Sequence, residues 1–501
     1  MARPARAAFE VSIDMSLFTI KSASTDADAT RSERHQLGRT LSGSSLVVLG
    51  VASSIGAGLF VLTGTAAANY AGPAVTFSYL IAGIACLCTG LCYAEFAALS
   101  PRTGSAYSYA YATMGELVAW IIGWDLVLEF LLSGVTVAVG WSGYFRGLLS
   151  SWGIHFPDAF AMSPLRFDHE HRLQPTGAIF NLPAAALIAV EAGLLYIGLR
   201  ESSRFLYAVV ALLLAVIALI VVAGIPYIDP THWRPFVPAN QGEWGRFGWS
   251  GIMTAAAVVF FSYTGFETVS AATREAKVPS RDIPLGVLGS LAICAVLYVT
   301  VALVMTGLAH YTRLGGAAPM ISALANAGPE LAWILPIVSC GIVFGLVAAP
   351  IGSMYAQSRI LFAMAEDGLL PDTFATVHPR FKTPHRATAW VGVLGVAAAG
   401  VLPLDLLGEL VSIGTLLAFV IVCASVLILR KTKPDLPRPF RVPGSPYVPS
   451  LGILICVYMM LSLPADTWIR LAIWLFVGLA LYALFGYRNS RAARGPTQLL
   501  K

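Results

Sequence analysis

Stretches of about 20 apolar residues, each long enough to cross the ~30 Å hydrocarbon core of a membrane as a helix, recur along the whole chain with polar segments between them. Each crossing segment should be helical, because a helix pairs its own backbone amides and lipid offers them no partner. The pattern therefore predicts an all-α polytopic membrane protein. Its twelve predicted transmembrane helices span residues 46–68, 74–99, 117–145, 180–199, 205–226, 250–272, 286–309, 332–362, 388–404, 407–429, 449–463 and 468–486.

The composition also indicates a membrane protein, and the distribution of Lys and Arg residues predicts its orientation in the membrane. Hydrophobic residues make up 57% of the chain and charged residues only 12%, whereas soluble domains carry roughly 25% charged residues. An even number of crossings places both termini on one side, and the loops of that side together with both tails hold 25 of the 32 Lys and Arg residues. Basic residues concentrate on the cytoplasmic side. We therefore expect a multi-pass protein of the cytoplasmic membrane with cytoplasmic termini, and the net charge of +5 indicates no nucleic-acid partner.

The remaining composition excludes several classes of function. Residues 1–44 are polar and predict a disordered cytoplasmic tail rather than a signal peptide, and residues 488–501 predict a second tail. All seven cysteines fall inside apolar segments, where they suit helix packing better than metal binding. The sequence holds no nucleophile with a positioned base, no spaced set of metal ligands and no cofactor motif. It therefore argues against an enzyme.

Two predicted helices contain internal interruptions. In the first, Gly56 and Gly58 flank Ala57 halfway across the membrane; five segments later, Gly265 and Glu267 lie at a similar depth. Glycines can also serve close helix packing, but two interruptions in corresponding positions are typical of an inverted repeat. We therefore predict a five-plus-five arrangement. One repeat would span residues 45–226, the other 248–430, and two appended helices would lie within 448–487.

An interrupted helix exposes backbone groups of both polarities. The free N–H groups at residues 56–58 would receive a carboxylate, since glycine lets a ligand approach the backbone closely. Carbonyls near Ser53 and Ser54, and those of residues 261–264, would receive an ammonium. Paired opposite polarities match a zwitterion. An α-amino acid fits this arrangement better than a sugar or a nucleobase.

Carboxyl and aromatic side chains at membrane depth are the next candidates. Carboxylates in lipid-depth segments are expensive and suggest function, although a neighbouring helix can also satisfy them. Glu267 follows the second interruption and could hold a gate or carry a proton, and Phe261 is the first choice for an aromatic gate. The other carboxyl and aromatic candidates are Glu95, Asp125, Glu129, Glu191, Phe260, Tyr263 and Phe266.

Seven stretches together resemble the amino acid-polyamine-organocation superfamily and, within it, the bacterial cationic amino acid transporter family. They cover the chain from about Leu46 to the end of the last predicted helix. The matching stretches are Ile55–Gly64, Tyr93–Ala97 with Pro101–Tyr107, Gly123–Glu129, Gly265–Val269 with Pro279–Pro284, Ser358–Pro371, Val411–Phe419 and Leu436–Pro443.

The resemblance implies a leucine-transporter-like fold that moves an amino acid by alternating access. In such relatives the first helix binds the substrate carboxylate, an aromatic residue six positions before the helix 6 glutamate forms a gate, and helices 3 and 8 line the side-chain pocket. Glu129 serves as both a pocket and a coupling candidate, with Phe261 and Glu267 as the other gating or coupling residues. The predicted substrate site comprises Ser53, Ile55, Gly56, Ala57, Gly58, Glu129, Phe261, Tyr263, Thr264, Gly265, Ser353 and Met354.

One position departs from the resembling family. Several proton-coupled relatives carry a lysine in helix 5, and the equivalent position here is Leu213. A leucine cannot titrate, so proton coupling is left to Glu129 or Glu267, with facilitated diffusion or exchange as the alternatives. Pro350 would also remove a backbone donor from helix 8. A polyamine carrier and a non-transporting amino acid sensor are the rival functions; side-chain specificity and oligomeric state stay open.

Overall fold

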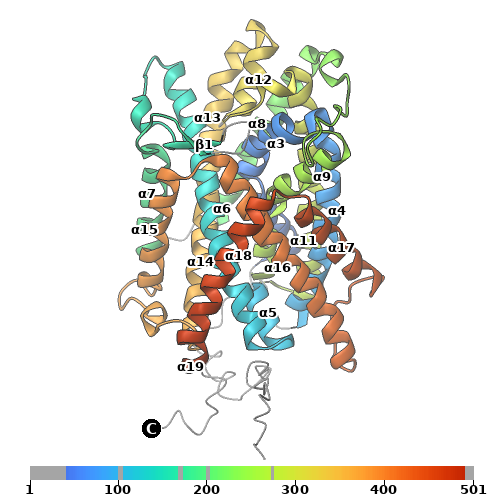
Figure 1. Ribbon diagram of the computed structural model, residues 1–501, viewed down its shortest axis with the longest axis vertical. Helices are drawn as coiled ribbons and strands as arrows, with labels where there is room; N and C mark the ends of the chain where they lie inside the picture. Colours follow the sequence, from blue (N-terminus) through green and yellow to red (C-terminus); the bar gives the residue numbers. More distant parts are fainter. Residues whose placement is uncertain are drawn as a thin grey trace, which may run out of the picture.

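The computed structural model describes residues 41–99, 105–167, 173–198, 203–271, 276–316 and 318–490. Its long helices run along the longest axis of the molecule (Figure 1). Most of both predicted tails and the predicted family stretch at residues 101–104 lie outside these ranges.

The first half of the chain forms helices near the predicted positions. Helix 1 begins earlier than expected, at Gly43, where the hydroxyl of Ser42 accepts the amide of Ser45 as an N-cap. The elements are α2 (Gly43–Ser54), η2 (Gly58–Leu62), α3 (Thr63–Ala66), η3 (Ala67–Ala71), α4 (Val75–Leu99), α5 (Ser105–Thr113), α6 (Glu116–Ser151), α7 (Leu182–Tyr196) and α8 (Ser203–Gly224).

The helices of the second half of the chain also lie near the predicted positions. Pro279 opens one long helix and Pro319 a short one, at the position where a missing N–H does no harm. The elements are α9 (Gly248–Val259), η8 (Phe260–Tyr263), α10 (Glu267–Ala271), α11 (Pro279–Leu308), α12 (Pro319–Ala327), η11 (Pro329–Ile334), α13 (Leu335–Leu346), α14 (Ala348–Glu366), α15 (His385–Val401), α16 (Leu404–Thr432), α17 (Tyr447–Leu461), α18 (Ala465–Leu481), η13 (Tyr482–Gly486) and α19 (Tyr487–Asn489).

Eight helical segments in the described part of the chain are long and apolar enough to cross a membrane. One of them, Gly58–Leu99, joins the second half of helix 1 to helix 2. The other predicted crossings correspond to the shorter helices α2, α7, α15 and α17. The chain is thus a mostly helical, multi-pass membrane protein, and the count of twelve crossings stays a prediction.

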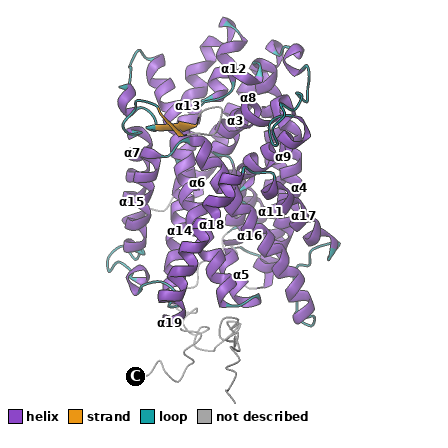
Figure 2. Cartoon of the chain, in the orientation of Figure 1, coloured by secondary structure: helices purple, strands orange, loops and turns teal. Residues whose placement is uncertain are grey.

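Three features between the long helices were not predicted. The strands β1 (Leu165–Phe167) and β2 (Leu173–Pro175) pair antiparallel, with Arg166 opposite Gln174, so the all-α expectation is wrong for this loop. The hairpin and α12 lie at one end of the molecule, and α5 lies at the other (Figure 2). Segments this short carry no membrane-length apolar run, and the sequence pattern therefore passed over them.

Glycines set the distance between neighbouring helices. A Cβ at Gly286 of α11 would lie 2.7 Å from the Leu46 Cβ of α2, and one at Gly345 of α13 would lie 2.2 Å from Cδ2 of Leu213 in α8. Small residues let membrane helices approach this closely. Leu213, the position expected to carry a lysine in proton-coupled relatives, therefore packs into a glycine groove.

Helix 8 loses a hydrogen bond near Pro350. The segment ends as α13 at Leu346 and resumes as α14 at Ala348. Pro350 has no N–H, so the carbonyl four residues earlier, that of Leu346, loses its helical donor. Val347, between the two helices, keeps helical dihedrals with φ −60° and ψ −31°, so the lost hydrogen bond leaves the helical path continuous.

A buried ion cluster joins helix 2 to the segment after helix 10. The Glu95 side chain, 2% exposed, lies 2.6 Å from Nη2 of Arg430 and 3.4 Å from Nε of Arg438. Its Oε2 also accepts the amide of Val442 at 2.7 Å. The sequence left open whether Glu95 has a functional role or is paired by a neighbouring helix. These contacts favour pairing by neighbouring segments.

Replacing Glu95 with Ala should lower the free energy of unfolding by roughly 3–5 kcal/mol, because it leaves two guanidinium groups without their buried partner. Thermal melting of the detergent-solubilised protein measures the loss. The control is Glu243→Ala. Glu243 pairs with Arg246 and is the more exposed side chain of that pair, so its removal should change the free energy of unfolding by less than about 1 kcal/mol. Equal melting temperatures for the two variants would contradict a structural role for the cluster.

Candidate functional site

Helix 1 comes apart at the glycines that flank Ala57. The helix α2 ends at Ser54, and Ile55 adopts an extended conformation with φ −76° and ψ 100°. Helical geometry resumes at Ala57. Among the described residues, none accepts a hydrogen bond from the amides of Gly56, Ala57 and Gly58. Three successive N–H groups are thus available at the start of the second half-helix.

Helix 6 is interrupted in the corresponding place. The helix α9 passes into the short η8 turn, and Thr264 is extended with φ −62° and ψ 147°. Gly265 then has φ +115°, a conformation that favours glycine. A Cβ at Gly265 would lie 2.4 Å from the carbonyl oxygen of Ser53. The two interruptions therefore touch each other through backbone atoms.

A small cavity of about 20 Å³ lies between these interruptions and the helices α6 and α14, so an amino acid can enter only if these segments move apart. Five hydroxyl groups line it, and no charged side chain of the described residues does. Ser133 of α6 and Ser353 of α14 share a hydrogen bond of 3.1 Å across it. The lining residues are Ser53, Ser54, Gly56, Gly58, Ser133, Val137, Phe261, Thr264, Ala349 and Ser353.

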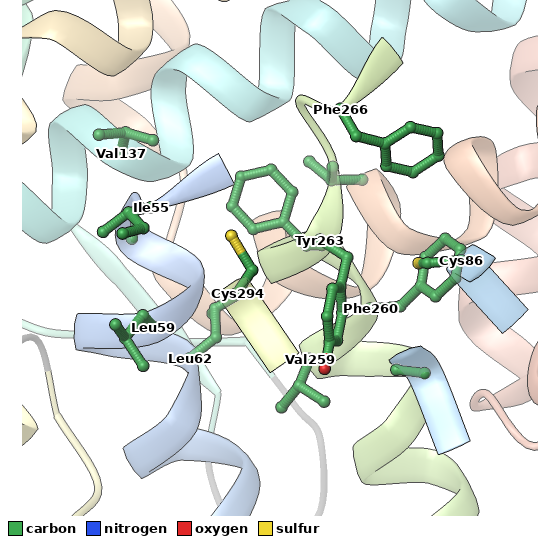
Figure 3. Close-up of a cluster of buried hydrophobic side chains, with 14 of the residues drawn as sticks. Ile55, Leu59, Leu62, Cys86, Val137, Val259, Phe260, Tyr263, Phe266 and Cys294 are labelled. Carbon is green, nitrogen blue, oxygen red and sulfur yellow. The ribbon is translucent and has the colours of Figure 1, made fainter. Parts of the chain in front are cut away.

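The structure brings together half of the residues predicted to bind substrate. The six that line the cavity are Ser53, Gly56, Gly58, Phe261, Thr264 and Ser353. Ile55, Ala57 and Tyr263 instead belong to the apolar core beside it; Figure 3 shows Ile55 and Tyr263 among the side chains of this cluster. Gly265 contributes backbone packing, and buried Met354 lies behind the wall, near Gly134.

Tyrosines hold the two interruptions in place. The Tyr298 hydroxyl of α11 lies 2.9 Å from the Ser54 carbonyl and 2.5 Å from the Ser262 carbonyl, so its single O–H lies between the carbonyl ends of both broken segments and donates to one or is shared by both. The Tyr79 hydroxyl of α4 lies 3.2 Å from the Gly58 carbonyl. The Tyr263 hydroxyl donates to the Tyr79 carbonyl at 2.9 Å. All three rings pack edge-on or tilted, with centroids 5.0–6.3 Å apart.

Several of these residues escaped the sequence analysis. Ser133 and Ala349 each lie four residues from a predicted site residue, Glu129 and Ser353 respectively, so helical spacing could have found them. Tyr298 lies in an otherwise apolar segment and offered only one clue, that a buried tyrosine hydroxyl needs a partner. The Ser54 carbonyl, which the sequence predicts to receive an ammonium, also lies 2.9 Å from the Tyr298 hydroxyl.

The acidic candidates lie outside the cavity. Asp125 and Glu129 of α6 and Glu267 of α10 are all buried. Glu129 interacts electrostatically with both of the others and accepts a hydrogen bond from Thr415 of α16. Both oxygens of Asp125 and one each of Glu129 and Glu267 lack a hydrogen-bond partner. Within the described ranges, no three His, Cys, Asp or Glu side chains are placed to hold a metal ion.

The chain is similar to known proteins over most of its length. A family model described as amino acid permease matches residues 41–486. The methylthioribose transporter of Bacillus subtilis is 42% identical, over 92% of this chain and 96% of that protein. The branched-chain amino acid permease of the same organism is also 42% identical, over 95% and 99%. The mitochondrial cationic amino acid transporter 3 of Arabidopsis thaliana is 30% identical over 92% of each chain.

These relatives span nearly their full length in the match, and they are permeases and transporters rather than enzymes. The matched range of the family model runs from two residues before α2 to Gly486, the last residue of η13. The chain therefore belongs to the amino acid permease family of the amino acid-polyamine-organocation superfamily.

Proposed function

We propose that the chain carries an α-amino acid across the cytoplasmic membrane and binds it as a zwitterion in the cavity between the two interrupted helices. The single observation that carries this proposal is the run of three amides at residues 56–58 that lack an acceptor. Unpaired donors inside a membrane protein are tolerated where a ligand or water can reach them. Gly56 and Gly58 both line the cavity, so a ligand there can reach them.

The polarity of the cavity sets the orientation of the substrate. The amides begin a half-helix whose dipole favours negative charge, so the α-carboxylate binds at Gly56 and Gly58. The α-ammonium then binds near Ser53, Phe261 and Thr264, residues that line the cavity and carry backbone carbonyls. The names of the relatives support this assignment, because the family model and the branched-chain permease both concern amino acids.

Alternating access requires that the two interrupted helices move against a fixed wall. The wall in this proposal is formed by α6 and α14, which are joined by the hydrogen bond between Ser133 and Ser353. Phe261 lies on the η8 turn, is 5% exposed and lines the cavity, so its ring can close over the substrate. The five-plus-five repeat is part of this proposal, supported by interruptions that lie five predicted helices apart.

The proposed orientation places both termini in the cytoplasm. Basic residues favour that side in the sequence. The short helix α5, which precedes α6, and the last element, α19, lie at one end of the molecule, opposite α12 (Figure 1). That arrangement is what an even number of crossings between α5 and α19 requires.

A second candidate substrate is a thioether sugar of the kind named for the methylthioribose transporter relative. The observation that favours it is the hydroxyl-rich lining, since Ser53, Ser133, Thr264 and Ser353 can all hydrogen-bond a ribose. A sugar would leave the three amides without a negatively charged partner. For that reason the amino acid is the preferred substrate.

Replacing Gly56 with Leu should reduce amino acid uptake by about tenfold or more, a loss that corresponds to about 1.4 kcal/mol of binding. A Cβ at this position has neighbours no closer than 3.8 Å, so the backbone accepts it while the rest of the side chain fills the cavity. Uptake into proteoliposomes measures the effect. Gly193→Leu on α7, where an added Cβ has no neighbour within 4 Å, is the matched control. If both variants take up amino acid at the wild-type rate, Gly56 is not part of the substrate site.

Replacing Phe261 with Ala should speed substrate release and weaken apparent affinity by about tenfold, because the ring no longer excludes water from the bound zwitterion. Counterflow of a labelled amino acid, measured over a range of substrate concentrations, gives the affinity. The control Phe344→Ala removes the same side chain from a position that is 63% exposed. If Phe261→Ala keeps the wild-type affinity and exchange rate, this residue is not a gate.

Methyl esters of amino acids should compete at least about tenfold less well than the free acids, since esterification removes the negative charge that the amides hold. Competition against uptake of a labelled amino acid measures this, with methylthioribose and putrescine as further competitors. Competition by methylthioribose alone would favour the sugar, and equal competition by acid and ester would favour an amine carrier.

A further inference from the structure

We propose that the beginning of α9 forms part of a binding site for a phospholipid with a zwitterionic headgroup, of the phosphatidylethanolamine type. The site is a second cavity, of about 430 Å³, between the start of α9, the end of η3 and the turn that joins α17 to α18. Small-molecule sites have volumes of roughly 300–1,000 Å³. Among the described residues, none lines both this cavity and the substrate cavity, so the two sites are distinct.

The wall of this second cavity carries a pair of opposite charges. Nε of Arg246 lies 3.2 Å from Oε2 of Glu243, and both residues line the cavity. The side chain of Glu243 is 68% exposed, and that of Arg246 is 25% exposed. A guanidinium has five N–H donors and can hold a phosphate beside a carboxylate. Since the carboxylate can receive an ammonium, the pair matches a headgroup in which phosphate and ammonium lie close together.

The loop that carries both charges is ordered by its own hydrogen bonds. The side-chain nitrogen of Asn240 lies 3.0 Å from the carbonyl oxygens of Glu243 and Arg246 and 3.2 Å from that of Phe247. The amide of Phe247 donates to the carbonyl of Tyr70 in η3 at 2.7 Å. A loop that is ordered beforehand loses little conformational entropy when a ligand binds, which favours binding.

The floor of the cavity lies at membrane depth. The helix α9 begins at Gly248, which also starts an apolar segment long enough to cross a membrane. The hydroxyl of Thr254, further along α9, donates to the carbonyl of Ser462 in the turn between α17 and α18 at 2.7 Å. From Gly248 to Thr254 a helix rises about 9 Å. The turn therefore meets α9 about 9 Å inside the start of the membrane segment, and the cavity is a recess above this contact.

Apolar and aromatic side chains continue from the cavity onto the surface of α17. Trp244 and Trp468 line the cavity, and tryptophan concentrates at the interface between membrane and water. Leu461 also lines the cavity and is 61% exposed, and Leu454 is 66% exposed. These leucines are seven residues apart and share one face of the helix. An acyl chain can cover that face, whereas a soluble zwitterion cannot, so the continuity favours a lipid.

A lipid in this cavity contacts segments of both interrupted helices. Tyr70 belongs to η3, which continues the second half of helix 1, and Thr254 belongs to α9, the first half of helix 6. Both residues line the cavity. Occupancy therefore acts on two segments that move during the proposed alternating access. This consequence rests on the proposed function, whereas the lipid site itself rests only on the membrane location of the chain.

The test measures lipid retention by the purified full chain, so its readout does not require transport. Native mass spectrometry of the detergent-solubilised protein counts the bound molecules of phosphatidylethanolamine, phosphatidylglycerol or phosphatidylcholine, each with the same acyl chains. Wild-type protein should retain phosphatidylethanolamine at least about tenfold better than the other two lipids. Phosphatidylglycerol has no ammonium, and the methylated ammonium of phosphatidylcholine cannot donate a hydrogen bond to Glu243.

Variants locate the retained lipid. Arg246→Ala removes the partner of the phosphate, and Ala465→Trp fills the cavity from an exposed position at the start of α18. Each should lower retention of phosphatidylethanolamine by about tenfold or more. Glu243→Gln should remove the preference for phosphatidylethanolamine over phosphatidylglycerol. The matched control is Arg313→Ala, which removes a guanidinium that hydrogen-bonds the exposed Asn326 and should keep the wild-type retention.

Four results would overturn the lipid site. The first is equal retention of the three lipids by wild-type protein, a result that does not depend on how any variant folds. The second is wild-type retention in both Arg246→Ala and Ala465→Trp, and the third is an equal loss in Arg313→Ala. The fourth is displacement of the lipid by excess L-alanine, which would assign the cavity to a soluble zwitterion. Failure of amino acid exchange in proteoliposomes would instead overturn the proposed function and leave lipid retention unchanged.

Discussion

The structure depends on one constraint, the need to satisfy backbone polar groups inside a membrane. An unbroken helix meets that need internally, and each break creates groups that need another partner. At the two breaks the partners are unequal. Tyr298 serves the carbonyls of Ser54 and Ser262, whereas no described group accepts the amides of Gly56, Ala57 and Gly58. In the proposed function, these unpaired amides make the substrate carboxylate the main determinant of binding.

The extent to which the sequence predicted this structure follows from the same constraint. Apolar run length located the long helices and glycine content located both breaks, because each of these features acts locally along the chain. The direction in which each side chain points at a break could not be predicted from the sequence, because an interrupted helix no longer follows a period of 3.6 residues. The side chains of Ile55, Ala57 and Tyr263 lie in the apolar core, whereas the role predicted for Ala57 belongs to its backbone amide. The hairpin and α12 left no signal of membrane length.

Recognition through the backbone also explains how the relatives can bear different names. Amide and carbonyl groups at the breaks are the same whatever side chains surround them, so they can bind one common part of many substrates. The variable part must contact α6 and α14, where Ser133, Val137, Ala349 and Ser353 form the wall. Relatives 42% identical to this chain are named for a branched-chain amino acid and for methylthioribose. The proposed backbone recognition accounts for a range of amino acids, whereas methylthioribose would have to bind through the hydroxyl groups of the lining.

The position of Leu213 in helix 5 allows close apolar packing and disfavours a charged side chain. The Leu213 side chain fills the groove left by Gly345, and Val216 one turn later does the same at Gly341. An ammonium at Leu213 would enter this apolar groove, and burying an unpaired charge is unfavourable. The interface between α8 and α13 is thus built for apolar contact.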